Sequence, residues 1–212
     1  MQPGDEPQST TSNPLVELLR GKRRLPADPT DHRPMIVFLC TGNAARSVIA
    51  AAMMRELLGP DSDYLIVSGG THVLPGQPMS VRTRRALERH GIADPWHRSH
   101  QLEEPDVERS SLIVAMEPMH IHWMQRTHPQ GIHKTGSLAR VSRGLPAYAG
   151  AASTSPRDAL DARVESLSLA DHQMEEWEEV IDPASGEQPE FDACADLIHR
   201  LIGEFHSSLV RR

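Results

Sequence analysis

One short stretch of the chain brings together three side chains that could act on a phosphate group. Cys40 is followed by five residues and then by Arg46 and Ser47. A thiolate is a strong nucleophile, an arginine can fork two oxygens of an anion, and a hydroxyl can donate a hydrogen bond to the thiolate. Residues of these types at this spacing predict a cysteine-dependent phosphatase with Cys40 as the nucleophile.

The segments on either side of this stretch predict how it is presented. Residues 35–39 are an apolar run that indicates a strand, and residues 48–58 are rich in alanine and methionine, which favour a helix. A loop between a strand and a helix turns backbone N–H groups toward an anion at the positive end of the helix dipole. We therefore expect the whole loop to bind phosphate, through Thr41, Gly42, Asn43, Ala44, Ala45, Arg46 and Ser47.

Strand and helix patterns alternate through the rest of the chain. Residues 64–67 and 111–116 are further apolar runs, while residues 79–90 and 117–126 have helical spacing. Alternation of this kind is typical of an α/β fold in which a parallel sheet is covered by helices on both faces. Such sheets bind ligands at the carboxyl ends of their strands, which is where Cys40 is expected to lie.

The composition narrows the class of protein. The chain has 212 residues and a net charge of −7, which fits one domain with extensions and argues against a general nucleic-acid binder. Its two cysteines are too few for a disulfide scaffold, so a reducing cytoplasm is the expected location, and it suits a catalytic thiol. No apolar run approaches the length of a membrane span.

The chain is expected to divide into an extension and a single domain. Residues 1–33 are interrupted by prolines and predict an N-terminal extension that is largely disordered. Residues 34–208 form the predicted domain, with a mobile insertion around residues 144–176. The last helix has an apolar stripe from Phe191 onward that includes Cys194, so we expect this second thiol to be a core residue.

Several motifs follow one another as they do in a known family. The phosphate loop comes first and is followed by a Ser68-Gly69-Gly70-Thr71 turn. A His97-Arg98-Ser99 segment comes next, and we expect it to begin a short strand over residues 97–102. After it come an Ile113-Val114-Ala115-Met116 strand followed by His120, and then Asp182-Pro183 before the last helix. In this order they resemble the low-molecular-weight protein tyrosine phosphatases, from about Met35 to Phe205. The related arsenate reductases share the loop, and the segment at 144–176 resembles the enlarged actinobacterial-type members.

The resemblance implies a fold and a mechanism. The implied fold is a single three-layer domain with a four-stranded parallel sheet in the order 2-1-3-4 and helices on both faces. The implied reaction transfers a phosphoryl group, expected to come from a protein phosphotyrosine, to Cys40 while Arg46 holds its oxygens. Asp182 is implied as the general acid that protonates the leaving oxygen and then activates water. No metal or organic cofactor is expected, and the His120–His122 pair is interpreted as helix surface.

Departures from the family pattern bear on the substrate. Ala45 stands where many members have a second cysteine, so a disulfide within the loop cannot form. Ala184-Ser185 stand where aromatic residues commonly wall the phosphotyrosine slot. Other aromatic side chains could replace those walls, namely Trp123, Tyr148 and Trp177.

Two alternative functions stay open. An arsenate reductase that uses a small thiol needs only Cys40, whereas an internal relay would need further cysteines between Cys40 and Cys194. A phosphate-binding module without turnover is the other alternative, although Cys40, Arg46 and Asp182 together favour turnover. The expected partners are a phosphorylated protein or a small phosphate ester, with inorganic phosphate as product, and no nucleic acid or membrane.

Overall fold

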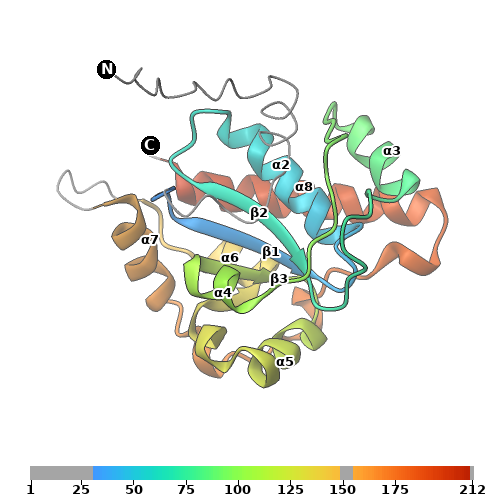
Figure 1. Ribbon diagram of the computed structural model, residues 1–212. Helices are drawn as coiled ribbons and strands as arrows, with labels where there is room; N and C mark the ends of the chain where they lie inside the picture. Colours follow the sequence, from blue (N-terminus) through green and yellow to red (C-terminus); the bar gives the residue numbers. More distant parts are fainter. Residues whose placement is uncertain (1–30, 149–154, 211–212) are drawn as a thin grey trace, which may run out of the picture.

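A central sheet enclosed by helices forms the body of the molecule (Figure 1). The structure is a computed structural model that describes residues 31–148 and 155–210. The expected N-terminal extension lies outside the described residues up to residue 30, and so does the part of the expected insertion at residues 149–154.

The sheet has four strands in the order β2-β1-β3-β4, and every neighbouring pair is parallel. The strands are β1 Met35–Cys40, β2 Leu65–Gly70, β3 Ser110–Ala115 and β4 Thr135–Ser137. In the register of the sheet Cys40 pairs with Gly70, and Ala115 pairs with Ser137. The carboxyl ends of the strands therefore meet at one edge, and the predicted fold class and strand order are confirmed.

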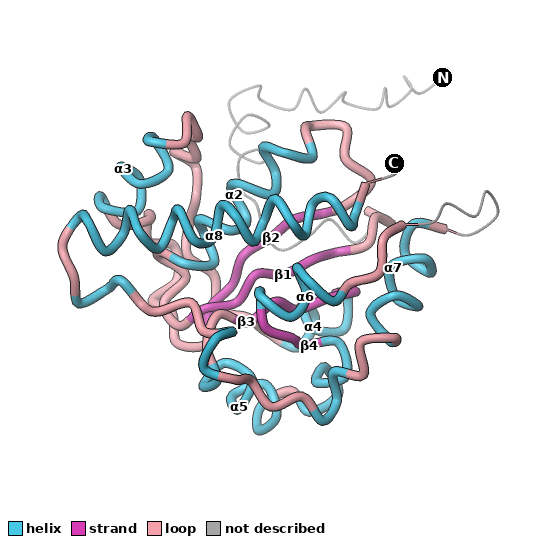
Figure 2. Tube along the Cα trace, turned by 180° about the vertical axis from the view of Figure 1, so that it is seen from behind, coloured by secondary structure: helices cyan, strands magenta, loops and turns pink. Residues whose placement is uncertain are grey.

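Helices cover both faces of this sheet, with α8 lying along the same face as α2 (Figure 2). The α-helices are α2 Arg46–Leu58, α3 Val81–Arg89, α4 Glu104–Arg109, α5 Pro118–Thr127, α6 Leu138–Gly144, α7 Pro156–Glu165 and α8 Gln188–Leu209. The 3-10 helices are η1 Pro129–Lys134, η2 Leu169–Asp171, η3 Glu176–Glu178 and η4 Pro183–Ser185.

Strand β1 is buried on both faces, which explains its unbroken apolar sequence. Ile36, Phe38 and Cys40 point into the larger core, which is completed by α2, α6 and α8. Met35, Val37 and Leu39 point into a smaller core with side chains of α4 and α5. Because alternate residues of a strand face opposite sides, the sixth residue of β1 brings the Cys40 side chain to the face that α2 covers.

The start of α2 leaves its first backbone donors uncapped by a side chain. The N-cap residue is Ala45, which has no polar atom on its side chain, and no side-chain cap bond forms there. Helices commonly satisfy these donors with a serine, threonine, aspartate or asparagine cap. An alanine at this position leaves the N–H groups available to an anion.

Residues 97–102, which were expected to form a short strand, differ from that expectation. Residues 97–102 form a single bridge, between Gln101 and Gly70, rather than a strand. The backbone N–H of His100 bonds instead to the Asn43 side chain, so this segment serves the phosphate loop. The fourth strand is β4, whose sequence Thr-Gly-Ser lacks the apolar run that would have predicted it.

Described residues of the 144–176 segment pack onto the sheet. Helix α7 lies against β3, with Leu160 and Val164 buried, and η2 lies against β4. A Cβ on Gly136 of β4 would meet Leu169 at 3.0 Å, so this contact depends on the absence of a side chain. Leu160 and Val164 thus share the buried face of a helix that ends at Glu165.

Helix α8 closes the domain with its apolar stripe, as expected. Phe191, Ile198 and Phe205 are buried, and Cys194 is 7% exposed on the same stripe. Burial raises the pKa of the Cys194 thiol to about 12, which keeps it protonated and unreactive near neutral pH. Among the described residues, no helix combines the length and apolarity that crossing a bilayer requires.

Gly70 packs so closely on the phosphate loop that we expect Gly70→Ala to destabilise the domain. The new Cβ would lie 2.5 Å from the carbonyl oxygen of Thr41 and 3.0 Å from the backbone nitrogen of Asn43. We expect the free energy of unfolding to fall by about 1–3 kcal/mol in urea denaturation. Gly203→Ala in α8 is the control, because a Cβ at this position meets nothing within 4 Å. This substitution also replaces a glycine in a helix interior, where alanine is more favourable. Equal stabilities for both variants would contradict the argument.

Candidate active site

Cys40 ends β1, and its thiol lies against the start of α2. Its Sγ is 2.9 Å from the Ser47 hydroxyl oxygen. That oxygen also accepts a hydrogen bond from Asn43 Nδ2 at 3.0 Å, so the hydroxyl hydrogen is directed to the sulfur. A serine placed in this way stabilises a thiolate more than a thiol.

Asn43 holds the loop between Cys40 and α2 in shape. It is fully buried and has a φ of 49°, a left-handed conformation that asparagine tolerates better than most residues. Its side-chain amide donates to Ser47, and its side-chain oxygen accepts from the backbone N–H of His100 at 2.9 Å. The side chain is therefore used in supporting the loop.

His97 supports the same residue from the other side. Its Nε2 donates to the Asn43 carbonyl oxygen at 2.9 Å. Burial lowers the pKa of His97, so the ring is neutral and carries its proton on Nε2. The sequence placed His97 in a strand and gave it no role in the site.

The remaining loop residues are held from neighbouring elements. The Ala44 carbonyl oxygen accepts from Thr83 Oγ1 in α3 at 2.8 Å, and the Thr41 carbonyl oxygen accepts from the backbone N–H of His72 at 3.0 Å. Carbonyl groups thus turn outward to α3 and to the end of β2. An anion site in the loop requires carbonyl oxygens to be held away from it in this way.

Arg46 is buried and bonds three acceptors in the protein. Its NH1 group donates to the Val180 carbonyl oxygen at 3.1 Å, and its NH2 group donates to Glu117 Oε1 at 2.8 Å and Asp182 Oδ2 at 2.7 Å. Burial opposes the charge of the guanidinium, but these carboxylates and Cys40 raise the pKa of Arg46 overall. Arg46 therefore stays charged and in a fixed orientation beside Cys40.

The structure brings Asp182 to the phosphate loop. The backbone N–H of Val180 bonds the Met116 carbonyl oxygen at 2.8 Å, which anchors this segment at the end of β3. Asp182 caps η4 by accepting from the backbone N–H of Ala184 through Oδ1 at 3.1 Å. Its side chain is 41% exposed, so the carboxyl group faces both Arg46 and solvent.

Glu117 and His120 are part of the site, although the sequence assigned no role to Glu117. Hydrogen bonds from His120 and Arg46 hold the pKa of Glu117 at about 2, against the effect of burial. Burial lowers the pKa of His120, which is fully enclosed, whereas His122 is exposed on α5. One sequence signal could have identified Glu117: it comes two residues after the end of β3, at the same sheet edge as Cys40.

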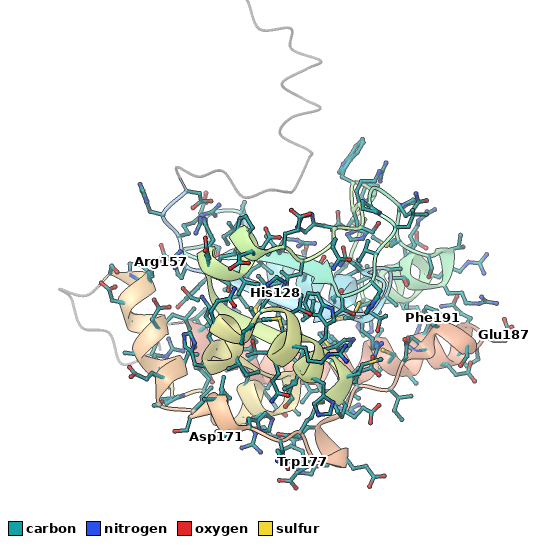
Figure 3. All side chains as sticks on the ribbon, turned by 60° about the horizontal axis from the view of Figure 1, so that its bottom comes forward. His128, Arg157, Asp171, Trp177, Glu187 and Phe191 are labelled. Carbon is teal, nitrogen blue, oxygen red and sulfur yellow. The ribbon has the colours of Figure 1, made fainter. Side chains whose placement is uncertain are left out.

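The aromatic residues considered as walls of the slot have partners elsewhere. The Trp177 ring lies 5.1 Å from the Arg143 guanidinium, Trp123 packs edge-on against His128, and Tyr148 lies 5.6 Å from Arg163. Figure 3 shows Trp177 well apart from Glu187 at the start of α8. Beside Asp182 the exposed apolar side chain is Ile181, at 76% exposure.

Comparison with known proteins identifies the family. A sequence model of the low molecular weight phosphotyrosine protein phosphatases matches residues 35–143. The chain is 34% identical over 106 residues to the probable low molecular weight protein-tyrosine-phosphatase EpsP of Ralstonia nicotianae, covering 50% of this chain and 69% of that protein. It is 30% identical over 109 residues to a protein-arginine-phosphatase of Geobacillus stearothermophilus, covering 51% and 72%.

Solved structures share the fold. The tyrosine phosphatase Wzb from Escherichia coli K30, in complex with sulphate, superposes with a TM-score of 0.63 at 20% identity, covering 84% of this chain and 99% of that chain. The YwlE arginine phosphatase from Geobacillus stearothermophilus superposes with a TM-score of 0.62 at 24% identity, covering 82% and 90%. The chain belongs to the low molecular weight phosphotyrosine protein phosphatase family. It is a cysteine-dependent phosphatase of the protein-tyrosine-phosphatase type.

Removing the Asn43 side chain should disable the loop without removing a reacting group. Asn43→Ala loses the bonds to Ser47 and His100 and makes the left-handed conformation less favourable. We expect kcat/KM on an aryl phosphate to fall about 10- to 100-fold. Asn43→Asp keeps the acceptor for His100, loses the donor to Ser47 and adds a negative charge beside the thiolate, so its rate should fall at least as far. A wild-type rate for Asn43→Ala would refute this role.

Proposed function

We propose that this enzyme hydrolyses phosphate monoesters through a phosphocysteine formed on Cys40, with Asp182 as general acid and base. The observation that carries the proposal is the contact of Arg46 with Asp182, 2.7 Å apart, at the end of the loop that Cys40 begins. Nucleophile, anion-binding arginine and acid then lie around one sheet edge, where a substrate phosphoryl group can meet all three.

The reaction proceeds in two displacements. The Cys40 thiolate attacks phosphorus, an S–P bond forms, and the P–O bond to the leaving group breaks as Asp182 donates a proton to that oxygen. Water then attacks the phosphocysteine and gives a proton back to Asp182, the S–P bond breaks, and inorganic phosphate leaves. Backbone N–H groups of the loop and Arg46 stabilise the phosphoryl oxygens in both steps, and Ser47 stabilises the thiolate.

Substrate binding requires an exchange at Arg46. Asp182 Oδ2 accepts one of the two NH2 hydrogens of Arg46, and Glu117 accepts the other. A phosphoryl oxygen carries more negative charge than a carboxylate oxygen and binds the same donor. We expect the substrate to displace Asp182 from Arg46, which frees the carboxyl group to face the leaving oxygen.

We propose a phosphorylated protein side chain as the substrate, with phosphotyrosine as the first candidate. Membership of the family and the similarity to a protein named as a tyrosine phosphatase support this choice. Phosphoarginine is the second candidate, supported by the relative named as a protein-arginine-phosphatase. It is also favoured by Ala184 and Ser185, which provide no aromatic wall for a phenol ring. The product in both cases is inorganic phosphate.

The proposed location of the enzyme follows from the need to keep the Cys40 thiol reduced. We propose that residues 34–208 form the catalytic domain and that it works in the reducing cytoplasm, where Cys40 stays a thiol. Both Cys40 and Cys194 are free in the structure, which supports this assignment. Small-thiol-dependent arsenate reduction is the competing reaction, because Cys194 is too buried to act as a relay.

Exchange of each cysteine tests the nucleophile. Cys40→Ser should lower turnover about 10³-fold or more, because a hydroxyl is far less ionised than a thiol. Cys194→Ser, the matched control, should stay within about twofold of wild type, because this thiol is buried on the apolar stripe of α8. Initial rates are measured on aryl phosphate, phosphotyrosine peptide, phosphoarginine peptide and arsenate, with and without small thiols. Equal losses of activity in the two variants, both folded, would overturn the assignment of Cys40 as nucleophile. If arsenate were the one substrate of the four that is turned over, the enzyme would be a reductase instead.

Loss of the general acid should depend on the leaving group. Asp182→Asn cannot protonate a phenol such as tyrosine, whose pKa is about 10, so phosphotyrosine cleavage should slow about 10²- to 10⁴-fold. An acidic phenol departs as an anion and should be affected much less. Single-turnover rates across aryl phosphates of graded acidity should give a shallow dependence for wild type and a steep one for Asp182→Asn. Two parallel, shallow lines would show that another group is the acid.

A further inference from the structure

We propose that Glu117 and His120 are positioning residues, and that one carboxylate oxygen of Glu117 ties both ends of the phosphate loop together. This inference rests on the proposed role of Arg46 in binding the phosphoryl group. The residues involved lie on different elements. Thr41 and Arg46 lie at the two ends of the loop. Glu117 is the N-cap of α5, and His120 lies in the first turn of that helix.

Three donors converge on the Oε1 atom of Glu117. The NH2 group of Arg46 lies 2.8 Å away, His120 Nε2 lies 3.1 Å away and Thr41 Oγ1 lies 3.3 Å away. Thr41 directly follows the nucleophile, and Arg46 is the first residue of α2, where the loop ends. Because both side chains bond to the same atom, the two ends of the loop are tied to a single point at the start of α5.

His120 fixes the orientation of that carboxylate. Its Nδ1 accepts from the backbone N–H groups of Met116 at 3.3 Å and Glu117 at 3.2 Å, so the proton of the neutral ring is on Nε2. That proton faces Glu117 Oε1 and Thr41 Oγ1, each 3.1 Å from Nε2. The ring is fully buried, so it has no alternative rotamer with water as a partner.

Glu117 gives Arg46 a permanent anchor, and Asp182 gives it a temporary one. The Glu117 side chain is 15% exposed, whereas that of Asp182 is 41% exposed and has to move to the leaving group during the reaction. When Asp182 moves, Glu117 and the Val180 carbonyl oxygen still hold the guanidinium. Arg46 can then present the freed NH2 hydrogen to a phosphoryl oxygen without reorienting.

The test compares vanadate inhibition in matched variants of the full chain. Glu117→Gln keeps the shape but removes the charge, and Thr41→Val removes only one hydroxyl from the shared oxygen. We expect the inhibition constant for vanadate to rise about 10- to 100-fold in Glu117→Gln and about 2- to 10-fold in Thr41→Val. His122→Asn, on the exposed side of α5, is the control and should stay within about twofold of wild type.

A double variant separates positioning from general stability. If Glu117 acts through Arg46, then Glu117→Gln should raise the inhibition constant for vanadate by less than about twofold when Arg46 is already replaced by lysine. Unchanged inhibition in Glu117→Gln and Thr41→Val, or full additivity with Arg46→Lys, would overturn the inference while leaving the phosphatase assignment in place. A wild-type enzyme that vanadate does not inhibit would instead overturn the proposed function, and this inference with it. Thermal unfolding of each variant confirms that the proteins compared are folded.

Discussion

The guanidinium of Arg46, buried at the start of α2, controls the arrangement of the site. A cation removed from water is tolerated only when anions and carbonyl groups surround it. Its acceptors come from the end of β3 and from the segment before α8, namely Glu117, Val180 and Asp182. The need to compensate one charge therefore brings three distant parts of the chain to the carboxyl edge of the sheet. In the proposed function the same charge binds the incoming phosphoryl group.

The parts of the site that are local in sequence could be predicted from it. The run from Cys40 to Ser47 carries its own chemistry, and the flanking strand and helix patterns place it at the sheet edge. Asp182 needed the family resemblance, because nothing in its neighbourhood shows that it reaches Arg46. The parallel sheet also followed from sequence, since buried parallel strands have continuous apolar runs.

The supporting residues could not be predicted, because their roles depend on contacts between segments far apart. His97 bonds a backbone oxygen 54 residues away, and a lone histidine gives no sign of such a partner. Glu178 sits in an acidic run that suggests a solvated turn, yet it is buried and paired with Arg140 at 2.9 Å. Strand β4 has no apolar pattern because neighbouring elements, not its own side chains, enclose it. Hydrophobic periodicity predicts which face of a helix or strand is buried, but it does not predict contacts between segments that are far apart in the sequence.

The long separation between Arg46 and its acceptors has a consequence for synthesis of the protein. Val180 and Asp182 follow Arg46 by 134 and 136 residues, beyond all four strands of the sheet. A chain emerging from the ribosome can pair its strands well before these acceptors exist, since domains assemble as their segments appear. Until then Arg46 can bond to Glu117, but the proposed acid Asp182 and the Val180 carbonyl oxygen are missing from the site. In the proposed mechanism the general acid is thus the last part of the site to be synthesised, so the site is completed only when the segment before α8 has emerged.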